Sequence, residues 1–179
     1  MPIALTLEHG PHPGIAKVEV ARRIKAMIHL LQLEKMDVSF VLTDDETIHQ
    51  LNKVYRGKDR PTDVLAFAMR EGEFADLAGS VLGDVIVSVP TARKQALSRR
   101  ANVLDEVTML LAHGLLHLLG WDHDTPAKDR RMKAETARLC AAAAPSRPSR
   151  TPSKDGAKKL LSQNRSVAKP HGRRRKARG

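Results

Sequence analysis

The feature that most restricts the fold of this chain is an abrupt change of composition near residue 145. Of the 179 residues, those beyond Pro145 hold 12 lysines and arginines against one acidic residue, so the formal net charge of +11 lies entirely in this segment. Serine and proline are also abundant there, and such a composition cannot bury enough apolar surface to offset chain entropy. We therefore expect one folded domain over residues 1–145 and a disordered, basic C-terminal tail over residues 146–179.

The tail allows two interpretations. The cluster from Arg173 to Arg178 can neutralise several phosphates, which favours an arm that binds RNA nonspecifically. A charge run of this kind also occurs as an extension that only increases solubility. The sequence leaves both interpretations open.

Cysteine content and hydropathy indicate the compartment. Cys140 is the single cysteine, so no intrachain disulfide can form, which fits a reducing environment. No apolar run approaches the ~18 residues that a membrane span requires. The first residues lack the basic flank of a secretion signal. These features predict a cytoplasmic protein without a membrane partner.

Hydrophobic periodicity predicts alternating strands and helices in residues 1–145. The expected strands are 3–7, 38–42, 64–69 and 81–89, and the expected helices are 14–33, a helix opened by Thr43, 91–97, 102–119 and a last helix from Thr125 to the alanine run. Thr43 and Glu46 have the spacing of a capping box, and Gly83 predicts a bulge in its strand. The order βαβαββααα predicts an α+β domain in which a small mixed four-stranded sheet packs against about five helices.

Three histidines are the strongest functional signal. His113 and His117 are four residues apart in an apolar segment expected to be helical, so their imidazoles project from one face. Gly120 suits the helix end, because glycine takes the left-handed conformation required there, and the reversed chain can bring His123 back. Packing three titratable groups in so apolar a segment without a metal would be costly. Three imidazoles with an open fourth position are typical of catalytic zinc, so we predict one Zn²⁺ on a central helix.

The residue after the first histidine limits what such a metal could do. The spacing His-x-x-x-His-x-x-Gly-x-x-His is also that of metzincin proteases, which place a glutamate general base directly after the first histidine. This chain has Gly114 there, so a metzincin-like metalloprotease is the alternative rather than the first hypothesis. A site without that base still suits phosphodiester cleavage if a cation shares the phosphate charge. A non-catalytic ribosome-binding factor stabilised by zinc is a third hypothesis.

A basic segment supplies candidate cations. Arg56, Lys58 and Arg60 surround a glycine just ahead of the third strand. Arg56 is the best candidate, because it should end a helix and its guanidinium can bind phosphate oxygens in a bidentate way. Lys58 and Arg60 are candidate RNA phosphate contacts. The alternative is a solvated loop in which Asp59 and Asp63 cancel part of the charge.

Three segments, in order, resemble the motifs of YbeY-type metal-dependent endoribonucleases, a family of rRNA maturation factors. They are His113 to His123 (HGLLHLLGWDH), Leu51 to Leu65 (LNKVYRGKDRPTDVL) and Leu82 to Ile86 (LGDVI). The resemblance covers residues from about 40 to 140, nearly the whole expected domain.

The resemblance implies single-strand-specific cleavage of RNA in bacterial rRNA maturation, including the 3′ end of 16S rRNA, and in ribosome quality control. Single-stranded rRNA and the small ribosomal subunit would then be the partners. It also implies zinc on His113, His117 and His123, and an Arg56 that is important for activity. Our mechanistic hypothesis is that Arg56 stabilises the pentacoordinate phosphorane. The sequence shows no clear general base, and two roles stay open for Asp122, which lies beside the motif: general base, or orientation of a ligand imidazole.

The sequence departs from the family pattern at two positions. Ala66 and Ala68 stand where the family usually has serine and proline, so any substrate contact from a serine hydroxyl is missing. The basic tail also lies outside the pattern. Aromatic residues are few and scattered along the chain, which predicts that RNA is held mainly through its phosphates, with low sequence selectivity.

Overall fold

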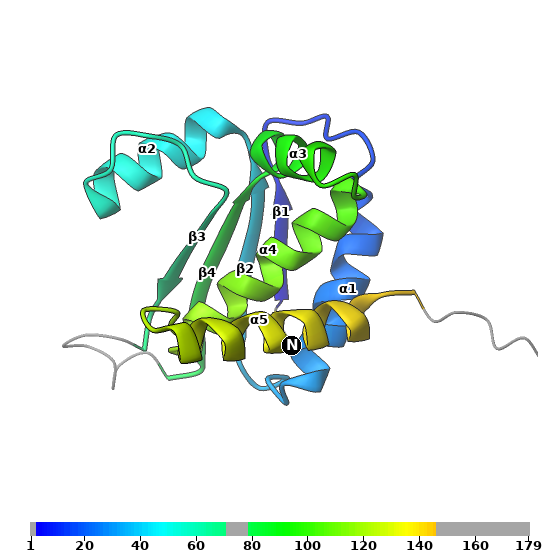
Figure 1. Ribbon diagram of the computed structural model, residues 1–179, viewed down its shortest axis with the longest axis vertical. Coiled ribbons are helices and arrows are strands. Elements are labelled where there is room, and N and C mark those ends of the chain that lie inside the picture. The colour runs from blue at the N-terminus through cyan, green and yellow to red at the C-terminus, as the bar shows by residue number, and fades with distance from the viewer. Residues whose placement is uncertain (1–2, 71–78, 146–179) are drawn as a thin grey trace, which may run out of the picture. The chain divides into compact units, whose positions relative to one another are not determined.

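The computed structural model describes residues 3–70 and 79–145. Its elements are β1 (Ile3–Leu7), α1 (Lys17–Leu30), β2 (Asp37–Thr43), α2 (Asp45–Arg56), β3 (Val64–Ala68), β4 (Val81–Ser88), α3 (Val89–Ser98), α4 (Val103–Leu118) and α5 (Pro126–Ala143) (Figure 1). This order confirms the predicted alternation, with shorter ends for the first helix and the third strand. The expected tail, residues 146–179, lies outside the described residues. Within the described ranges, no helix combines the length and the hydropathy that crossing a membrane requires.

The sheet is mixed and has four strands in the order β1-β2-β4-β3. The first three of these run parallel, and β3 pairs with β4 in the antiparallel sense at one edge. Phe40, in the middle of β2, lies between Leu5 of β1 and Val85 of β4. The predicted α+β architecture, a small mixed sheet with five helices in the described part, is therefore confirmed.

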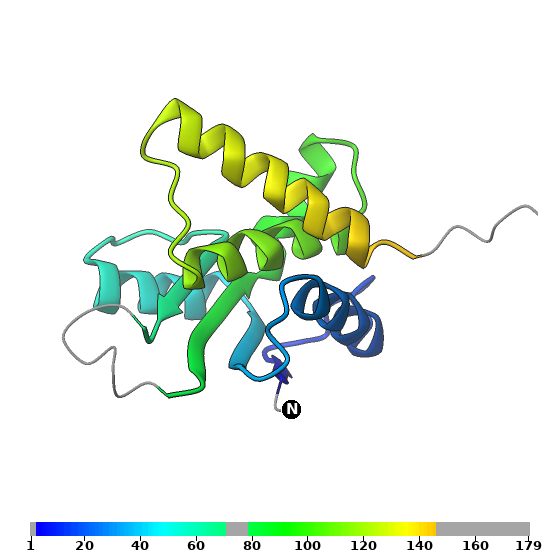
Figure 2. The same ribbon diagram turned by 90° about the horizontal axis from the view of Figure 1, so that it is seen from below.

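The two faces of the sheet are covered unequally. Alternate residues of β2 and β4, such as Phe40 and Val85, join the large core that includes residues of α1 and α4, whereas Ile86 and Leu65 point to the other face and contact Ile48 of α2. Seen from below, α4 lies between the sheet and α5 (Figure 2). A helix covered on opposite sides is apolar almost all round, which explains the composition of this segment. The predicted metal-site helix is thus the central helix of the fold.

The start of α2 differs from the prediction. Asp44, not Thr43, is the N-cap residue, and its side chain accepts a hydrogen bond of 2.8 Å from the Thr47 amide. Thr43 pairs with Ser88 as the last residue of β2, so the parallel pairing keeps it in the strand. Its hydroxyl is buried without a hydrogen-bond partner in the structure, and Glu46 accepts from Gln50 instead of reaching back. The predicted capping box is wrong by one residue because the sheet extends further than the local pattern indicates.

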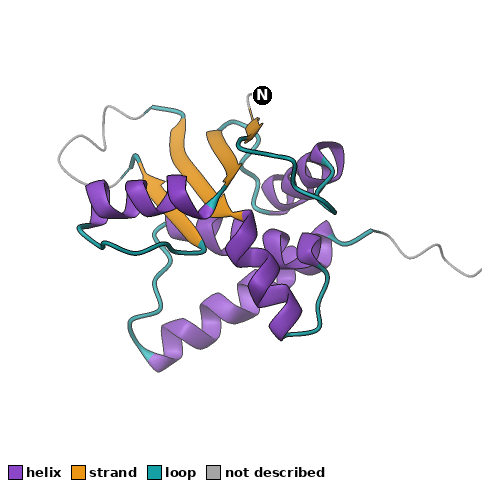
Figure 3. Cartoon of the chain, turned by 90° about the horizontal axis from the view of Figure 1, so that it is seen from above, coloured by secondary structure: helices purple, strands orange, loops and turns teal. Residues whose placement is uncertain are grey.

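The carboxylate of Asp45, at the start of α2, bonds to residues at the start of α3. Ser88 is the N-cap of α3, and its hydroxyl also donates to the Asp45 carboxylate, as does the Thr91 hydroxyl at 2.6 Å. Lys94 adds an ion pair of 3.0 Å to the same carboxylate. As a result, α2 and α3 are held at the same end of the sheet (Figures 1 and 3).

The predicted irregularity at Gly83 is present. Asp37 pairs with Val81 and Val38 with Gly83, so Leu82 is the extra residue of a bulge. A β-carbon on Gly83 would lie 2.1 Å from the Phe67 carbonyl oxygen. Since such a contact is impossible, glycine is required where β3 and β4 approach each other at this point.

Candidate metal centre

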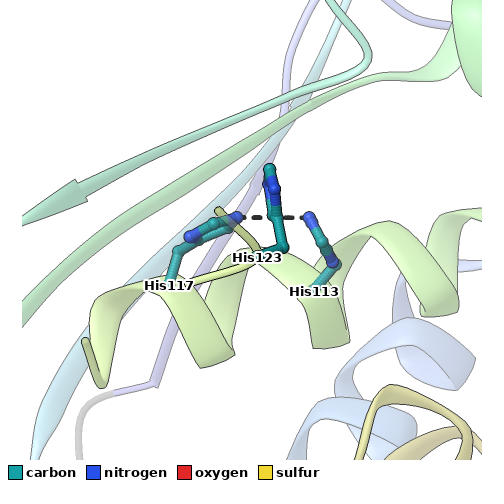
Figure 4. Close-up of side chains that lie close together, drawn as sticks. All are labelled: His113, His117 and His123. Carbon is teal, nitrogen blue, oxygen red and sulfur yellow. Dashed lines mark hydrogen bonds between the residues drawn. The ribbon is translucent and has the colours of Figure 1, made fainter. Parts of the chain in front are cut away.

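The three predicted histidines converge on one point. His113 and His117 project from the same face of α4, and His123 follows on the loop towards α5 (Figure 4). One ring nitrogen from each residue lies within 4.8 Å of the corresponding nitrogens of the other two. The Nε2 atoms of His113 and His117 are 3.2 Å apart. The spacing argument from the sequence therefore predicted the correct cluster.

The turn after α4 places the third histidine. Gly120 has φ +78°, and its amide donates to the His117 carbonyl, while the Trp121 amide donates to the Leu116 carbonyl. These bonds satisfy the last carbonyls of the helix in a left-handed end, as predicted for Gly120. The Asp122 carboxylate then accepts a hydrogen bond of 2.6 Å from the His123 amide. In the described part of the chain, Asp122 therefore contacts the backbone of the turn and has no hydrogen bond to a ligand imidazole.

The surroundings of the two helical histidines favour their neutral form. Partial burial, with the neighbouring His117 and His123, holds the pKa of His113 below its usual value. Burial and His123 lower the pKa of His117 in the same way. Neutral imidazoles have a free lone pair, so this donor set suits a divalent transition metal. Three nitrogen ligands leave at least one coordination position for water or substrate.

Gly114 explains how α4 comes close enough to the sheet. A β-carbon on Gly114 would lie 2.5 Å from Cγ1 of Val85 and 3.2 Å from Cγ2 of Val64. Position 114 therefore faces β3 and β4 and has no room for any side chain. A glutamate could not occupy it as the metzincins require, so the geometry provides no protease-type general base there.

Arg56 ends α2, as predicted, and lies at the open edge of β3. Its Nη2 donates a hydrogen bond of 2.8 Å to the Ala66 carbonyl oxygen, and its guanidinium carbon lies 6.0 Å from the centre of the Phe67 ring. Neither partner neutralises its charge. Burial and His123 lower the pKa of His117 most, and the positive charge of Arg56 lowers it further.

The loop after Arg56 exposes its basic residues. Asp59 faces α2, where it contacts Lys53 at 2.8 Å and His49 at 2.7 Å. The buried Asn52 side chain donates to the Arg60 carbonyl at 2.7 Å, which fixes the path of the loop. Within residues 3–70 and 79–145, neither Lys58 nor Arg60 has an ion-pair partner. Asp59 therefore offsets the charge of α2 rather than that of the two candidate phosphate contacts.

One groove joins these parts. It has a volume of about 1140 Å³ and is lined by the three histidines, Arg56, Lys58, Arg60 and Asp122, together with Asp63, Ala66, Ala68 and Phe67. Two features of the groove were not predicted from the sequence. The Ala66 carbonyl holds Arg56, and Tyr55 and Phe67 form an aromatic pair with ring centres 5.3 Å apart. Each of the two contacts joins residues at least ten positions apart in the sequence. The alternation of side chains along β3 is the only sequence signal that could have indicated which residues face the groove.

Comparison with known proteins agrees with this geometry. Residues 13–144 match the family Endoribonuclease YbeY. Endoribonuclease YbeY of Geobacter sulfurreducens is 38% identical over 143 residues, covering 79% of this chain and 95% of the relative. That of Syntrophus aciditrophicus is 38% identical over 106 residues, covering 59% of this chain and 66% of the relative, so the match spans about two thirds of it.

A solved structure supports the fold. The solution structure of a protein from Thermotoga maritima has a TM-score of 0.57 and 20% identity, and the match covers 94% of this chain and all of that one. At this identity the likeness concerns the fold alone. The family match includes the histidine cluster, Arg56 and the bulged strand β4. The chain therefore belongs to the YbeY endoribonuclease family.

Proposed function

We propose that this protein is a zinc-dependent, single-strand-specific endoribonuclease that acts in bacterial rRNA maturation, including the 3′ end of 16S rRNA, and in ribosome quality control. The observation that carries the proposal is the convergence of His113, His117 and His123 in one groove with Arg56. Two similar proteins bear the name endoribonuclease, which supports RNA as the substrate class.

The cluster fits a resident metal ion, and we assign zinc because three histidines with an open position are typical of catalytic zinc sites. His113 and His117 would hold it from the helix, and His123 from the turn. When bound, such an ion supplies Lewis-acid chemistry and lowers the pKa of bound water. The role of the protein is to keep the two helical ligands neutral and partly buried, and to fix the third by the Asp122 contact with its amide.

In this mechanism Arg56 binds the phosphate whose ester bond is cut. Its hydrogen bond to the Ala66 carbonyl uses one amino group, and the remaining donors can bind phosphate oxygens. Negative charge builds on these oxygens in the pentacoordinate transition state, so a fixed guanidinium stabilises that state more than the substrate. Lys58 and Arg60 would hold neighbouring phosphates of the strand, because they are exposed on the rim of the same groove.

These assignments also suggest the domain boundaries, the partners and the location of the protein. We place the catalytic domain at residues 1–145, supported by the compact unit formed by Met1–Ala144, and the basic tail at residues 146–179. The partners would be single-stranded rRNA and the small ribosomal subunit, with the tail adding nonspecific RNA contacts. A protein with these partners acts in the cytoplasm.

The test combines metal analysis with RNA cleavage. Purified protein should contain about one zinc per chain and cut an end-labelled single strand but not the matched duplex. A chelator should stop cleavage and added zinc should restore it. His113→Ala should contain no metal and leave the strand intact. Binding to ribosomal subunits without release of RNA fragments would instead favour the non-catalytic, zinc-stabilised ribosome-binding factor. Hydrolysis of peptides would favour the metalloprotease hypothesis.

A further inference from the structure

An exposed aromatic residue stands beside the phosphate-binding arginine. Tyr55, the single tyrosine of the chain, lies on the last turn of α2 and is 66% exposed. Its ring contacts Phe67 edge to face, with centres 5.3 Å apart and planes inclined by 66°. Phe67 in turn lies beside the Arg56 guanidinium. The tertiary structure thus joins two aromatic residues that are twelve positions apart in the sequence.

The position of this pair indicates a ligand. Tyr55 and Phe67 line the same groove as the histidine cluster, and Arg56, Lys58 and Arg60 contribute positive charge around them. Among the residues that the structure describes, these three cations have no acidic partner, and aromatic rings beside such cations do not suit an apolar peptide. This arrangement suits a polyanion that carries flat rings, since bases stack on aromatic side chains while basic groups hold the phosphates.

We propose that Tyr55, supported from the side by Phe67, is a stacking site for one base of single-stranded RNA next to the phosphate held by Arg56. This inference rests on the proposed function and deepens it by naming a subsite of the groove. Because the two ring planes are inclined by 66°, both rings cannot stack on the same base, and Tyr55 is the more exposed of the two.

The stacking site gives a physical reason for a preference for single strands. A base within a duplex is already paired and stacked, so it cannot reach an aromatic side chain, whereas an unpaired base can be turned outwards. Stacking accepts all four bases, so the site selects for strandedness rather than for sequence. The proposed site adds one base contact to the phosphate contacts that the sequence predicts.

The experiment compares full-length, zinc-loaded variants on a short single-stranded RNA. Tyr55→Leu should raise KM about tenfold and leave kcat within about twofold, because it removes binding surface without touching the metal or Arg56. Tyr55→Phe should rescue KM, since it keeps the aromatic ring. The matched control is Val54→Ala, whose side chain is next in sequence, 72% exposed and outside the groove lining. Thermal unfolding should show that all three variants are folded.

A second readout does not require cleavage. Anisotropy of a labelled strand, with the metal removed by a chelator, gives the dissociation constant directly. An RNA strand with one abasic position should bind the wild-type protein about tenfold more weakly than the intact strand, and should bind Tyr55→Leu as well as the intact strand does. This difference between the two proteins should persist as salt is raised, because stacking does not depend on phosphate charge. Equal binding by Tyr55→Leu and wild type, or an equal loss in Val54→Ala, would overturn the stacking site. Base-dependent binding, together with no cleavage by the zinc-loaded protein, would overturn the proposed function and leave the stacking site standing.

Discussion

Gly114 and Val85 form a close helix-to-sheet contact beside the histidine cluster: a single added carbon on Gly114 would lie 2.5 Å from Cγ1 of Val85. The neighbouring residue on the helix is His113, which we propose as a metal ligand. The distance between α4 and β4 therefore determines where the first metal ligand lies relative to the groove that β3 borders.

Gly114→Ala should lower the free energy of unfolding by about 1–3 kcal/mol, because α4 must move away from the sheet. Chemical denaturation measures this loss. Val85→Ala in the same chain should recover part of it, since it removes the atoms that the new methyl group meets. Strictly additive losses in the double variant would show that the two positions do not interact.

Arg56→Ala should reduce the cleavage rate by about tenfold or more and leave zinc content unchanged, because in the proposed mechanism Arg56 binds phosphate and not the metal. Arg56→Lys should retain part of the activity, since lysine keeps the charge but loses the bidentate geometry. The matched control is Arg93→Ala, because Arg93 likewise donates to a backbone carbonyl, that of Pro13, but lies outside the groove lining. Unchanged cleavage by Arg56→Ala would remove this residue from the site.

His113→Ala and His117→Ala should each reduce bound zinc from about one per chain to near zero, because two nitrogen ligands rarely retain the ion. His123→Ala should bind zinc more weakly as well, since it removes the third ligand. Elemental analysis after dialysis measures the content. His29→Ala is the control, because this exposed histidine lies at the end of α1. Within residues 3–70 and 79–145, Glu34 is the only residue that forms a hydrogen bond with its side chain. Full zinc content in His113→Ala would contradict the assigned ligands.

Asp45 should make the stability depend on pH. Burial alone would raise its pKa, but hydrogen bonds from Ser88, Thr91 and Lys94 outweigh this effect and lower it. The unfolded chain then takes up a proton at higher pH than the folded chain, so this stabilisation is complete above the ordinary aspartate pKa and is lost as pH falls through the folded value. Asp45→Asn should be less stable by about 1–2 kcal/mol near neutral pH. Denaturation at about pH 3 should show a smaller difference, and a constant difference would contradict this account.

Removal of the tail after Ala144 should make RNA binding less dependent on salt, because fewer phosphates are then neutralised. Cleavage of a short strand should be retained, since the metal cluster and Arg56 lie upstream. The slope of log affinity against log salt measures the effect. An identical slope for the truncated and full-length chains would favour the solubilising interpretation of the tail.

Local patterns in the sequence were sufficient for the order of elements and for the metal cluster. His113 and His117 are related by one helical turn, and Gly120 marks the reversal that brings back His123, so no distant contact is needed to place them. The mixed sheet followed from the alternation of strands and helices, because short connections leave few arrangements.

Features that depend on the register of the sheet could not be predicted in this way. Thr43 pairs with Ser88 at the end of β2 and therefore stays in the strand. The N-cap of α2 is consequently the next residue, Asp44. In the same way, the contact of Arg56 with the Ala66 carbonyl and that of Tyr55 with Phe67 exist only once α2 lies against β3.

All three ligand histidines lie within one segment of eleven residues. Their effective concentration around an ion therefore remains high even when the rest of the chain is unfolded, because closing so short a loop costs little entropy. An ion with residual affinity for the denatured chain raises the melting temperature by less than its affinity for the native protein implies. Arg56 belongs to another helix and has no such local advantage. In the proposed mechanism, phosphate binding is therefore lost on global unfolding, whereas part of the metal binding persists.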